Sequence, residues 1–538
     1  MKQQHGKNTG IRYLWLAIIG FMTPVLVAQA ELTDITQTTP NVPGGAIGKS
    51  LQQQVGAGRG DKFTAGSSIY LIKRDPFRSV RRGRQLFQRK FTMAEGFGPR
   101  VSHDSIGDIH ENPGLGAGLV DSCAGCHGRP RGSAGVGGDL GTRPDSRDAP
   151  HLFGLGLKEM LADEITRDLR AIRSQALALA VDGKSAVTRP LISKDIRYGA
   201  IRALPDGSIV TSLIQGVDPD LRVRPFFHHG GEFSIRGFAV GAFKDEMGLE
   251  AADPDLCRAT DPNNPIKITT PAGLVLDPAL DKIKQPPGCN AVNDADGDGV
   301  VIEIDPALVD HMEFYLLNYF KPGTGKMTKR AESGLGLLKE IGCTDCHIQN
   351  LRVNRDRRIA DVETRFDAAK GIFNRLFATA ATLFNVVDDG QVHSQLLPKK
   401  NSFLVKNIFA DFKRHDLGAA FHERQYDGSL VTKFMTEPLW GVGSTAPYGH
   451  DGRSINLEEV ILRHGGEAQQ SKQRFASLSD NSQRKILEFL NTLVLFPPDD
   501  TASNLNAGNP GTHDPQEPAE HGSINLGALF QIPEEGPE

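Results

Sequence analysis

Apolar residues recur at helical spacing in a few separate stretches of the chain. The clearest case places four residues on one helix face at i, i+3, i+4 and i+7, namely Leu457, Val460, Ile461 and His464. Asn456 can cap this helix, with Glu459 three residues later as a capping box. Another helix is expected over 308–320. Long Gly- and Pro-rich segments separate these stretches, so the pattern predicts a mainly α fold with long loops and insertions.

The start of the chain has the parts of an export signal. A basic segment is followed by an apolar run over 13–27, which is shorter than the ~20 residues that a membrane span needs. A small-residue cleavage site follows at Ala28–Ala30, so residues 1–30 are interpreted as a signal peptide. This predicts a periplasmic protein with no stable membrane span after cleavage. The alternative is an uncleaved anchor.

Composition and charge limit the number of domains and the kinds of partner that are expected. The chain has 538 residues, of which 39% are hydrophobic, and this length allows about two to four domains with buried cores. The formal net charge is only −4, so neither nucleic acid nor an anionic membrane surface is expected as a partner.

A C-x-x-C-H motif accounts for four of the six cysteines. It occurs twice, as Cys123, Cys126 and His127 and again as Cys343, Cys346 and His347. Two thiols at this spacing can add to the two vinyl groups of one porphyrin, while the adjacent His takes an axial site of the iron. A zinc half-site or a redox pair does not require that His, which is present in both copies. The sequence therefore predicts two covalently bound c-type haems.

The two motifs also indicate an internal duplication. Their histidines are 347 − 127 = 220 residues apart, and Ser234–Ile235 falls on Ser454–Ile455 at the same offset. The predicted organisation is an extended N-terminal arm, two cytochrome c-like haem domains in tandem and a flexible tail, over 31–75, 76–305, 306–498 and 499–538.

Cys257 and Cys289 are the two remaining cysteines, and a Pro- and Asn-rich segment separates them. In an oxidising compartment they most simply form one structural disulfide. The alternative is two free thiols.

An acidic segment between the predicted domains has the spacing of a calcium loop. Asp294, Asp296 and Asp298 occupy positions 1, 3 and 5, and Gly299 follows at position 6. Position 12 is Asp305 rather than the usual Glu, and the alternative is a solvated acidic turn.

The sixth ligand of each iron decides its chemistry, because a strong second ligand favours electron transfer and an open site can bind an oxidant. For the second haem the expected ligand is His464, with Met435 as the main rival and His450 and His422 as weaker candidates. At the offset of 220 the residue that matches His464 is Lys244, which is a poor iron ligand when protonated.

The first haem is therefore expected to have an open iron. Glu246 is the candidate catalytic residue, because peroxide cleavage needs a carboxylate that takes up a proton and delivers it to the leaving oxygen. In one alternative Glu246 is an exposed acid at a helix end. In another, Met247 is a sixth ligand that closes the site.

Several segments together resemble the di-haem oxidoreductases, which belong to the bacterial di-haem cytochrome c peroxidase superfamily. They lie at 121–130, 149–156, 241–248, 437–441 and 450–453. The resemblance spans roughly residues 83–496. It implies two mostly helical cytochrome c domains with a calcium ion between them, a peroxidatic N-terminal haem and a C-terminal haem that transfers electrons.

The resemblance also implies roles for single residues. A Glu-Met pair supplies the catalytic Glu of the peroxidases and maps onto Glu246 and Met247. Their second haem carries a distal Met in the helix where this chain has His464. Their bridging Trp falls near His228, so Trp440, the only Trp outside the leader, is a candidate relay.

The expected function is that of a periplasmic di-haem peroxidase-like oxidoreductase. It would reduce hydrogen peroxide or another small oxidant at the N-terminal haem, with electrons that a redox partner protein supplies through the C-terminal haem. The alternatives are a pure electron-transfer cytochrome and a di-haem oxygenase or protein-modifying oxidoreductase.

Overall fold

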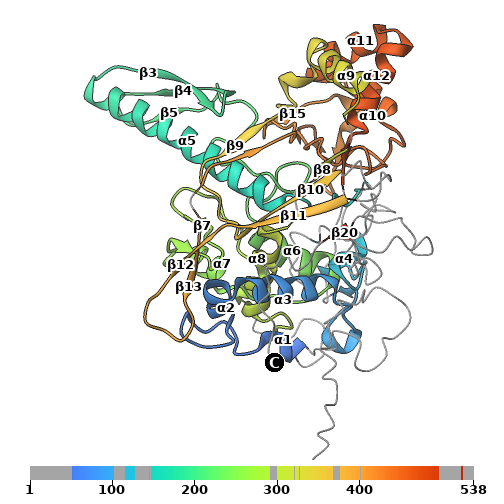
Figure 1. Ribbon diagram of the computed structural model, residues 1–538. Helices are drawn as coiled ribbons and strands as arrows, with labels where there is room; N and C mark the ends of the chain where they lie inside the picture. The colour runs from blue at the N-terminus through green and yellow to red at the C-terminus, as the bar shows by residue number, and fades with distance from the viewer. Residues whose placement is uncertain are drawn as a thin grey trace, which may run out of the picture.

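The helices gather in three groups, each around its own apolar core (Figure 1). The computed structural model describes residues 51–101, 109, 115–127, 145, 147–290, 300–319, 322–325, 327–366, 376–399, 401–495 and 523–524. The expected signal peptide and the expected calcium loop with Asp294, Asp296 and Asp298 lie outside the described residues. Within those residues, no helix is both long enough and apolar enough to span a bilayer.

The α-helices of the described residues are α1 Leu51–Val55, α2 Ser68–Arg74, α3 Pro76–Gln88, α4 Cys123–His127, α5 Leu155–Asp182, α6 Ile235–Met247, α7 Pro254–Ala259, α8 Pro306–Leu317, α9 Lys329–Glu340, α10 Leu457–Arg463, α11 Gln469–Ser477 and α12 Asp480–Leu490. The strands are β1 Arg100–Val101, β2 Leu115–Gly116, β3 Val187–Ser193, β4 Ile196–Ala203, β5 Ile209–Val210, β6 Ile268–Thr269, β7 Val275–Leu276, β8 Gly323–Thr324, β9 Leu351–Val353, β10 Ala360–Phe366, β11 Leu376–Thr382, β12 Phe384–Val387, β13 Gln395–Pro398, β14 Phe403–Val405, β15 Arg414–His415, β16 Glu423–Arg424, β17 Leu430–Val431, β18 Phe434–Met435, β19 Leu493–Val494 and β20 Ser523–Ile524.

The prediction of a mainly α fold made of two tandem cytochrome c-like domains is wrong. The described residues contain twenty strands beside twelve α-helices. In the described residues the strands pair in many small sheets of two or three strands. The long segments that were expected to be loops contain these pairs, because backbone N–H and C=O groups that leave water need hydrogen-bond partners.

The first core lies between α3, α6 and α8, in the lower part of Figure 1. α3 crosses α8 so closely that a Cβ at Gly83 would lie 2.1 Å from the carbonyl oxygen of His311. The side chain of Ser79 on α3 also hydrogen-bonds Nδ1 of His311 over 2.8 Å. α8 therefore shares a core with α3 and α6, although it lies beyond the boundary expected at residue 305.

Buried charges tie three helices of this group together. Arg236 on α6 is fully buried and contacts Asp253, which caps α7. Its guanidinium lies 2.9 Å from Asp310 and 2.7 Å from Glu313, both on α8. The position of α6 thus depends on one cation held among three carboxylates.

The second core is built on α5, which projects with β3, β4 and β5 at the upper left of Figure 1. β3 and β4 form an antiparallel hairpin that packs along this helix. The side chain of Tyr198 is fully buried and donates a hydrogen bond to the carbonyl oxygen of Asp411. This hydrogen bond fixes the hairpin to the segment around Asp411, which lies between the second C-x-x-C-H motif and β18.

The third core joins α9, α11 and α12 at the upper right of Figure 1. α9 and α12 meet closely, since a Cβ at Gly334 would lie 1.9 Å from the carbonyl oxygen of Lys485. Phe409 and Phe489 pack edge to face in this core at 5.7 Å between ring centroids. The third core thereby holds Phe409, whose carbonyl oxygen accepts a hydrogen bond from His347 of the second motif.

Three further findings concern the two ends of the described chain and the remaining cysteines. Part of the stretch expected as an extended arm forms α1 and α2, and α2 starts where Ser67 accepts a hydrogen bond from the backbone N–H of Tyr70. In the expected tail, β20 pairs with β11. Cys257 and Cys289 are joined by a disulfide.

Candidate functional site

The first C-x-x-C-H motif forms the short helix α4 at the edge of the first core, where Ala124 is buried and Cys123 packs against it. The ring of His127 is half-buried, and its Nδ1 lies 2.7 Å from the carbonyl oxygen of Pro150. A carbonyl oxygen can only accept, so Nδ1 donates, and Nε2 of the neutral ring keeps its lone pair. Among the described residues, this Nε2 has no hydrogen-bond partner, so it is available to a metal.

The second motif repeats this arrangement on another element. After α9, Gly342 turns the chain with a φ of 87°, and a 3-10 turn, η3 Cys343–Asp345, follows. Nδ1 of His347 donates to the carbonyl oxygen of Phe409 over 2.9 Å. Phe409 has a φ of 54°, a left-handed conformation that costs a non-glycine residue roughly 1–3 kcal/mol. The fold accepts this cost and holds the carbonyl where His347 can bind it.

These residues fit two c-type haems. In each motif both cysteines lie outside any disulfide and are half-buried. Burial lowers the pKa of His127 and lowers the pKa of His347 to about 4, so both rings are neutral at neutral pH, the state in which imidazole binds iron. A hydrogen bond from the far ring nitrogen to a backbone carbonyl is the usual support of a metal-bound histidine.

The thiols do not have the properties of a redox pair. Burial raises the pKa of Cys123 to about 12 and that of Cys343 to about 11. Redox-active C-x-x-C motifs need a thiol whose pKa is lowered, because the thiolate is the attacking species. The C-x-x-C-H motifs are therefore better suited to covalent attachment of a cofactor than to thiol exchange.

His464 lies close to His347. α10 ends at Arg463, so His464 is its C-cap and not, as expected, a residue inside the helix. Its Nδ1 donates to the carbonyl oxygen of Val460 over 2.7 Å, and its ring packs edge to face on Phe421 at 5.4 Å. Burial is the main cause of the low pKa of His347, and a charge on His464 would lower that pKa further. The charge of His464 is thus felt at His347, and among the described residues Nε2 of His464 has no hydrogen-bond partner.

The three rivals of His464 have other contacts. Met435 lies in β18 and belongs to the second core. His450 is buried and stacks on Phe434 at 4.1 Å between centroids. Nε2 of His422 lies 3.0 Å from a carboxylate oxygen of Asp416. These contacts favour His464 as the ligand opposite His347.

The first motif faces one side of α6. The rings of His127 and Phe238 lie edge to face at 6.4 Å. The half-buried residues of α6 at helical spacing from Phe238 are Gly241, Ala242 and Glu246. The backbone N–H of Leu119 donates to the carbonyl oxygen of Glu246 over 2.8 Å, which places the segment before the first motif beside the end of α6.

The other residues proposed near this end of α6 point elsewhere. Lys244 is 3% exposed, and its Nζ donates to the carbonyl oxygen of Ile109 over 2.8 Å. Met247 is 2% exposed and packs in the first core. Of the charged residues of α6, Glu246 is the one that is not buried, and it shares a face with Phe238. The structure therefore leaves Glu246 as the candidate for proton transfer.

A polar cluster beside His127 was not assigned from the sequence. Nε2 of His228 donates to the carbonyl oxygen of Asp148 over 3.0 Å, and its Nδ1 lies 3.5 Å from Glu437. Lys158 lies 3.2 Å from the other oxygen of Glu437. Burial would raise the pKa of Glu437, but Lys158 and His228 lower it to about 2. These residues come from three distant segments, so no local motif could have revealed the cluster.

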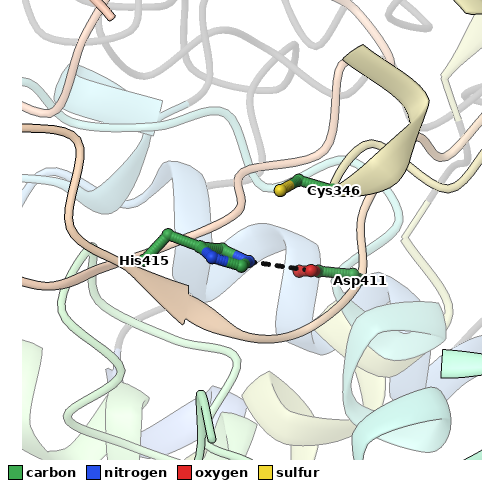
Figure 2. A group of neighbouring side chains, drawn as sticks. All are labelled: Cys346, Asp411 and His415. Carbon is green, nitrogen blue, oxygen red and sulfur yellow. Dashed lines mark hydrogen bonds and ion pairs between the residues drawn. The ribbon is translucent and has the colours of Figure 1, made fainter. Parts of the chain in front are cut away.

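A second group lies beside the second motif (Figure 2). Ligand atoms of Cys346, Asp411 and His415 lie within 4.8 Å of one another, as a small metal site would require. However, Nε2 of His415 is 2.8 Å from Asp411, and its Nδ1 is 2.7 Å from Glu467. With both ring nitrogens held by carboxylates, His415 has no free lone pair for a metal. The group is better explained as support for the strand that follows Asp411.

A pocket of about 540 Å³ adjoins this group. Its charged lining residues are Lys413, Arg414, His415, Lys433 and Glu467. Arg414 is already paired with Asp218, so the pocket is only moderately basic.

Comparisons with known proteins bear on the second part of the chain. Residues 346–493 match the model of the family described as "Di-haem oxidoreductase, putative peroxidase". The expected resemblance to this family is thus confirmed over the segment that contains His347 and His464, and the match supports a di-haem oxidoreductase in general.

Two other comparisons add little. No curated protein matches the chain. Among solved structures, a hydrazine synthase from Kuenenia stuttgartiensis, pressurised with xenon, matches with 14% sequence identity and a TM-score of 0.20. The match covers 35% of this chain and 56% of that one. The chain thus spans about half the length of this relative.

Proposed function

We propose that the protein is a c-type di-haem oxidoreductase that reduces hydrogen peroxide. Each peroxide molecule would take up two electrons and two protons and leave as two molecules of water. A redox partner protein in the periplasm would supply the electrons one at a time. One observation carries the proposal: His127 and His347 both donate Nδ1 to a backbone carbonyl and keep Nε2 available, and each directly follows two cysteines that are not in a disulfide.

The chain offers a complete set of groups to hold two haems. Cys123, Cys126 and His127 would hold one, and Cys343, Cys346, His347 and His464 would hold the other. When bound, the haems would supply one-electron transfer and a site at which peroxide is reduced.

His464 would close the second iron and reserve it for electron transfer. In His464→Ala we expect the low-spin EPR signal of that haem to be replaced by a high-spin signal that added cyanide converts to low spin. The control is His422→Ala, because His422 is held by Asp416 and its loss should leave both signals as in the parent. An unchanged low-spin signal in His464→Ala would show that another residue is the ligand.

Glu246 would act on the proton of the substrate. Its carboxylate would take a proton from hydrogen peroxide and return it to the oxygen that leaves as water, as a general base and then a general acid. Glu246→Gln keeps the shape of the side chain but cannot accept this proton. We expect peroxide turnover to fall by roughly 10²–10⁴-fold, the usual contribution of such a group, in a steady-state assay with an artificial electron donor.

A matched control for Glu246→Gln is Glu332→Gln, which makes the same chemical change at an exposed position of α9. It should turn over peroxide at the parental rate. Equal haem content in both variants would assign the loss to proton transfer rather than to assembly. Parental activity in Glu246→Gln would remove Glu246 from the reaction.

EPR of the oxidised protein with and without cyanide tests the proposed function as a whole. One cyanide-sensitive high-spin signal beside one unaffected low-spin signal is the expected result. Two low-spin signals that ignore cyanide, before and after partial reduction, would favour a pure electron carrier. Oxygen uptake with an organic substrate and no peroxide would favour an oxygenase or a protein-modifying enzyme. Calcium binding at 294–298 stays a prediction.

A further inference from the structure

The two motif histidines are joined by a continuous series of short backbone segments and hydrogen bonds. The series runs from His127 to His347 through residues that are far apart in the sequence. Each hydrogen bond in it has a donor and an acceptor of fixed identity, because a carbonyl oxygen accepts in every case.

The first half of the series passes through His151. Nδ1 of His127 donates to the carbonyl oxygen of Pro150 over 2.7 Å, and Pro150 is bonded directly to His151. Nε2 of His151 then donates to the carbonyl oxygen of Trp440 over 3.2 Å. One imidazole ring thus connects the loop that supports the first motif to the segment that contains Trp440.

The second half continues through the backbone. Trp440 is bonded to Leu439, whose N–H donates to the carbonyl oxygen of Ile408 over 3.0 Å. Ile408 is bonded to Phe409, and the carbonyl oxygen of Phe409 accepts from Nδ1 of His347 over 2.9 Å. The series therefore ends at the ring that would bind the second iron, after four hydrogen bonds and three peptide links.

His151 is held in the tautomer that this series needs. The backbone N–H of Phe153 donates to Nδ1 of His151 over 3.2 Å, so Nδ1 accepts and Nε2 carries the proton. The ring is near that of Phe153, at 6.0 Å between centroids in an edge-to-face arrangement.

Close packing fixes Trp440 against the same loop. A Cβ at Gly154 would lie 2.6 Å from the indole ring of Trp440, and a Cβ at Gly441 would lie 3.3 Å from Nε2 of His151. Both glycines have φ values in the left-handed region, 72° and 82°. Glycine at these two positions therefore lets the two backbone segments approach until the hydrogen bond from His151 can form.

We propose that His151 is the bridging residue through which an electron passes between the two haem sites. This inference rests on the proposed function, because it requires that both motifs hold haem. One electron would leave the haem bound by His347 and arrive at the haem bound by His127, and each hydrogen bond of the series would keep its proton. His151 is a bridging residue and not a catalytic residue, since it touches neither substrate nor iron.

Pulse radiolysis of the fully oxidised protein with both haems tests this role directly. A brief reducing pulse adds less than one electron per molecule, and a subsequent phase whose rate is independent of protein concentration reports transfer within the molecule. His151→Phe keeps an aromatic ring but removes the donor, and we expect this phase to slow by roughly tenfold or more. His151→Gln places an amide donor near the position of Nε2 and should restore much of the rate.

Tyr448→Phe is the matched control. It removes the hydrogen bond from the Tyr448 hydroxyl to the carbonyl oxygen of Val442, 2.8 Å long, in the same segment but outside the series. Its transfer rate should equal that of the parent. EPR spectra and haem content identical to those of the parent would show that the variants have kept both iron sites.

The outcomes separate the two proposals. A parental rate in His151→Phe, with two haems present, would overturn the role of His151 and leave the proposed function intact. The absence of any concentration-independent phase in the parent would also overturn it, because the haems would then exchange no electron within the molecule. Fewer than two haems per chain in the parent would instead overturn the proposed function.

Discussion

Replacing both Cys123 and Cys126 by serine is expected to remove one of two covalent haems, and replacing both Cys343 and Cys346 is expected to remove the other. A serine hydroxyl does not form the thioether link to a porphyrin vinyl group. In each double variant the pyridine haemochrome spectrum should report half of the parental haem per polypeptide. Haem-dependent staining of the denatured chain should fall by the same factor.

The third pair of cysteines supplies a control from the same chain. Cys257 and Cys289 are joined by a disulfide, so the double serine variant should keep both haems. Loss of haem in that variant as well would indicate a general failure of folding. Parental haem content in either motif variant would show that the motif does not attach haem.

A single substitution separates haem attachment from a small metal site beside the second motif. Cys346 belongs both to that motif and to the group with Asp411 and His415, whereas Cys343 belongs to the motif alone. Cys343→Ser should therefore weaken covalent haem attachment. If Cys346, Asp411 and His415 instead held a metal, neither the parent nor the variant would carry haem at this position. The metal content would then be the same in Cys343→Ser as in the parent.

The local parts of the candidate site could be predicted from the sequence. Each C-x-x-C-H motif lies within five consecutive residues, and in both copies the His donates Nδ1 to a backbone carbonyl. Asn456 caps α10 as its sequence indicates. The helix expected over 308–320 is present as α8, Pro306–Leu317. In these cases the interactions that define the feature lie within a few residues, so neighbouring sequence is sufficient.

Features that depend on distant segments were missed or misjudged. The many short strands could not be recognised, because two-residue pairs such as β15 and β18 have no periodic pattern to detect. The offset of 220 paired Lys244 with His464, yet Lys244 is buried against Ile109 while His464 caps a helix end. The contacts of His151 and His228 join segments that are 80 or more residues apart, and such pairs leave no trace in a single sequence.

Arg236→Met is expected to cause the largest loss of stability among single substitutions of a charged residue in the first core. Arg236 is fully buried and lies among Asp253, Asp310 and Glu313. Methionine fills a similar volume but removes the cation that all three carboxylates share, although Asp310 also lies 3.4 Å from Arg59. Breaking a buried ion pair by removing one partner costs roughly 3–5 kcal/mol, and we expect the free energy of unfolding in urea at pH 7 to fall by about this amount.

The pH dependence of this loss provides a second readout. Burial raises the pKa of Asp310 and of Glu313, although Arg236 opposes the shift in both. Without Arg236 both pKa values should rise further, so the folded variant would bind more protons than the unfolded chain. Stability then decreases as pH rises from the ordinary carboxyl pKa through the raised values. The difference between Arg236→Met and the parent should therefore be smaller at pH 5 than at pH 7.

Arg202→Met makes the same chemical change at an exposed position of β4, where surface substitutions usually alter stability by no more than about 0.5 kcal/mol. If Arg236→Met were no less stable than Arg202→Met, hydration or protonation of the three carboxylates would have replaced the ion pairs with little loss of free energy. Arg236 would then contribute little to the stability of the first core. If the expected loss is found, the position of α6 depends on this charge cluster. The contact between Phe238 on α6 and the ring of His127 then depends on it as well. Peroxide turnover by Arg236→Met, relative to the parent, should then be closer to the parental value at pH 5 than at pH 7, because α6 also carries Glu246, the proposed proton-transfer group.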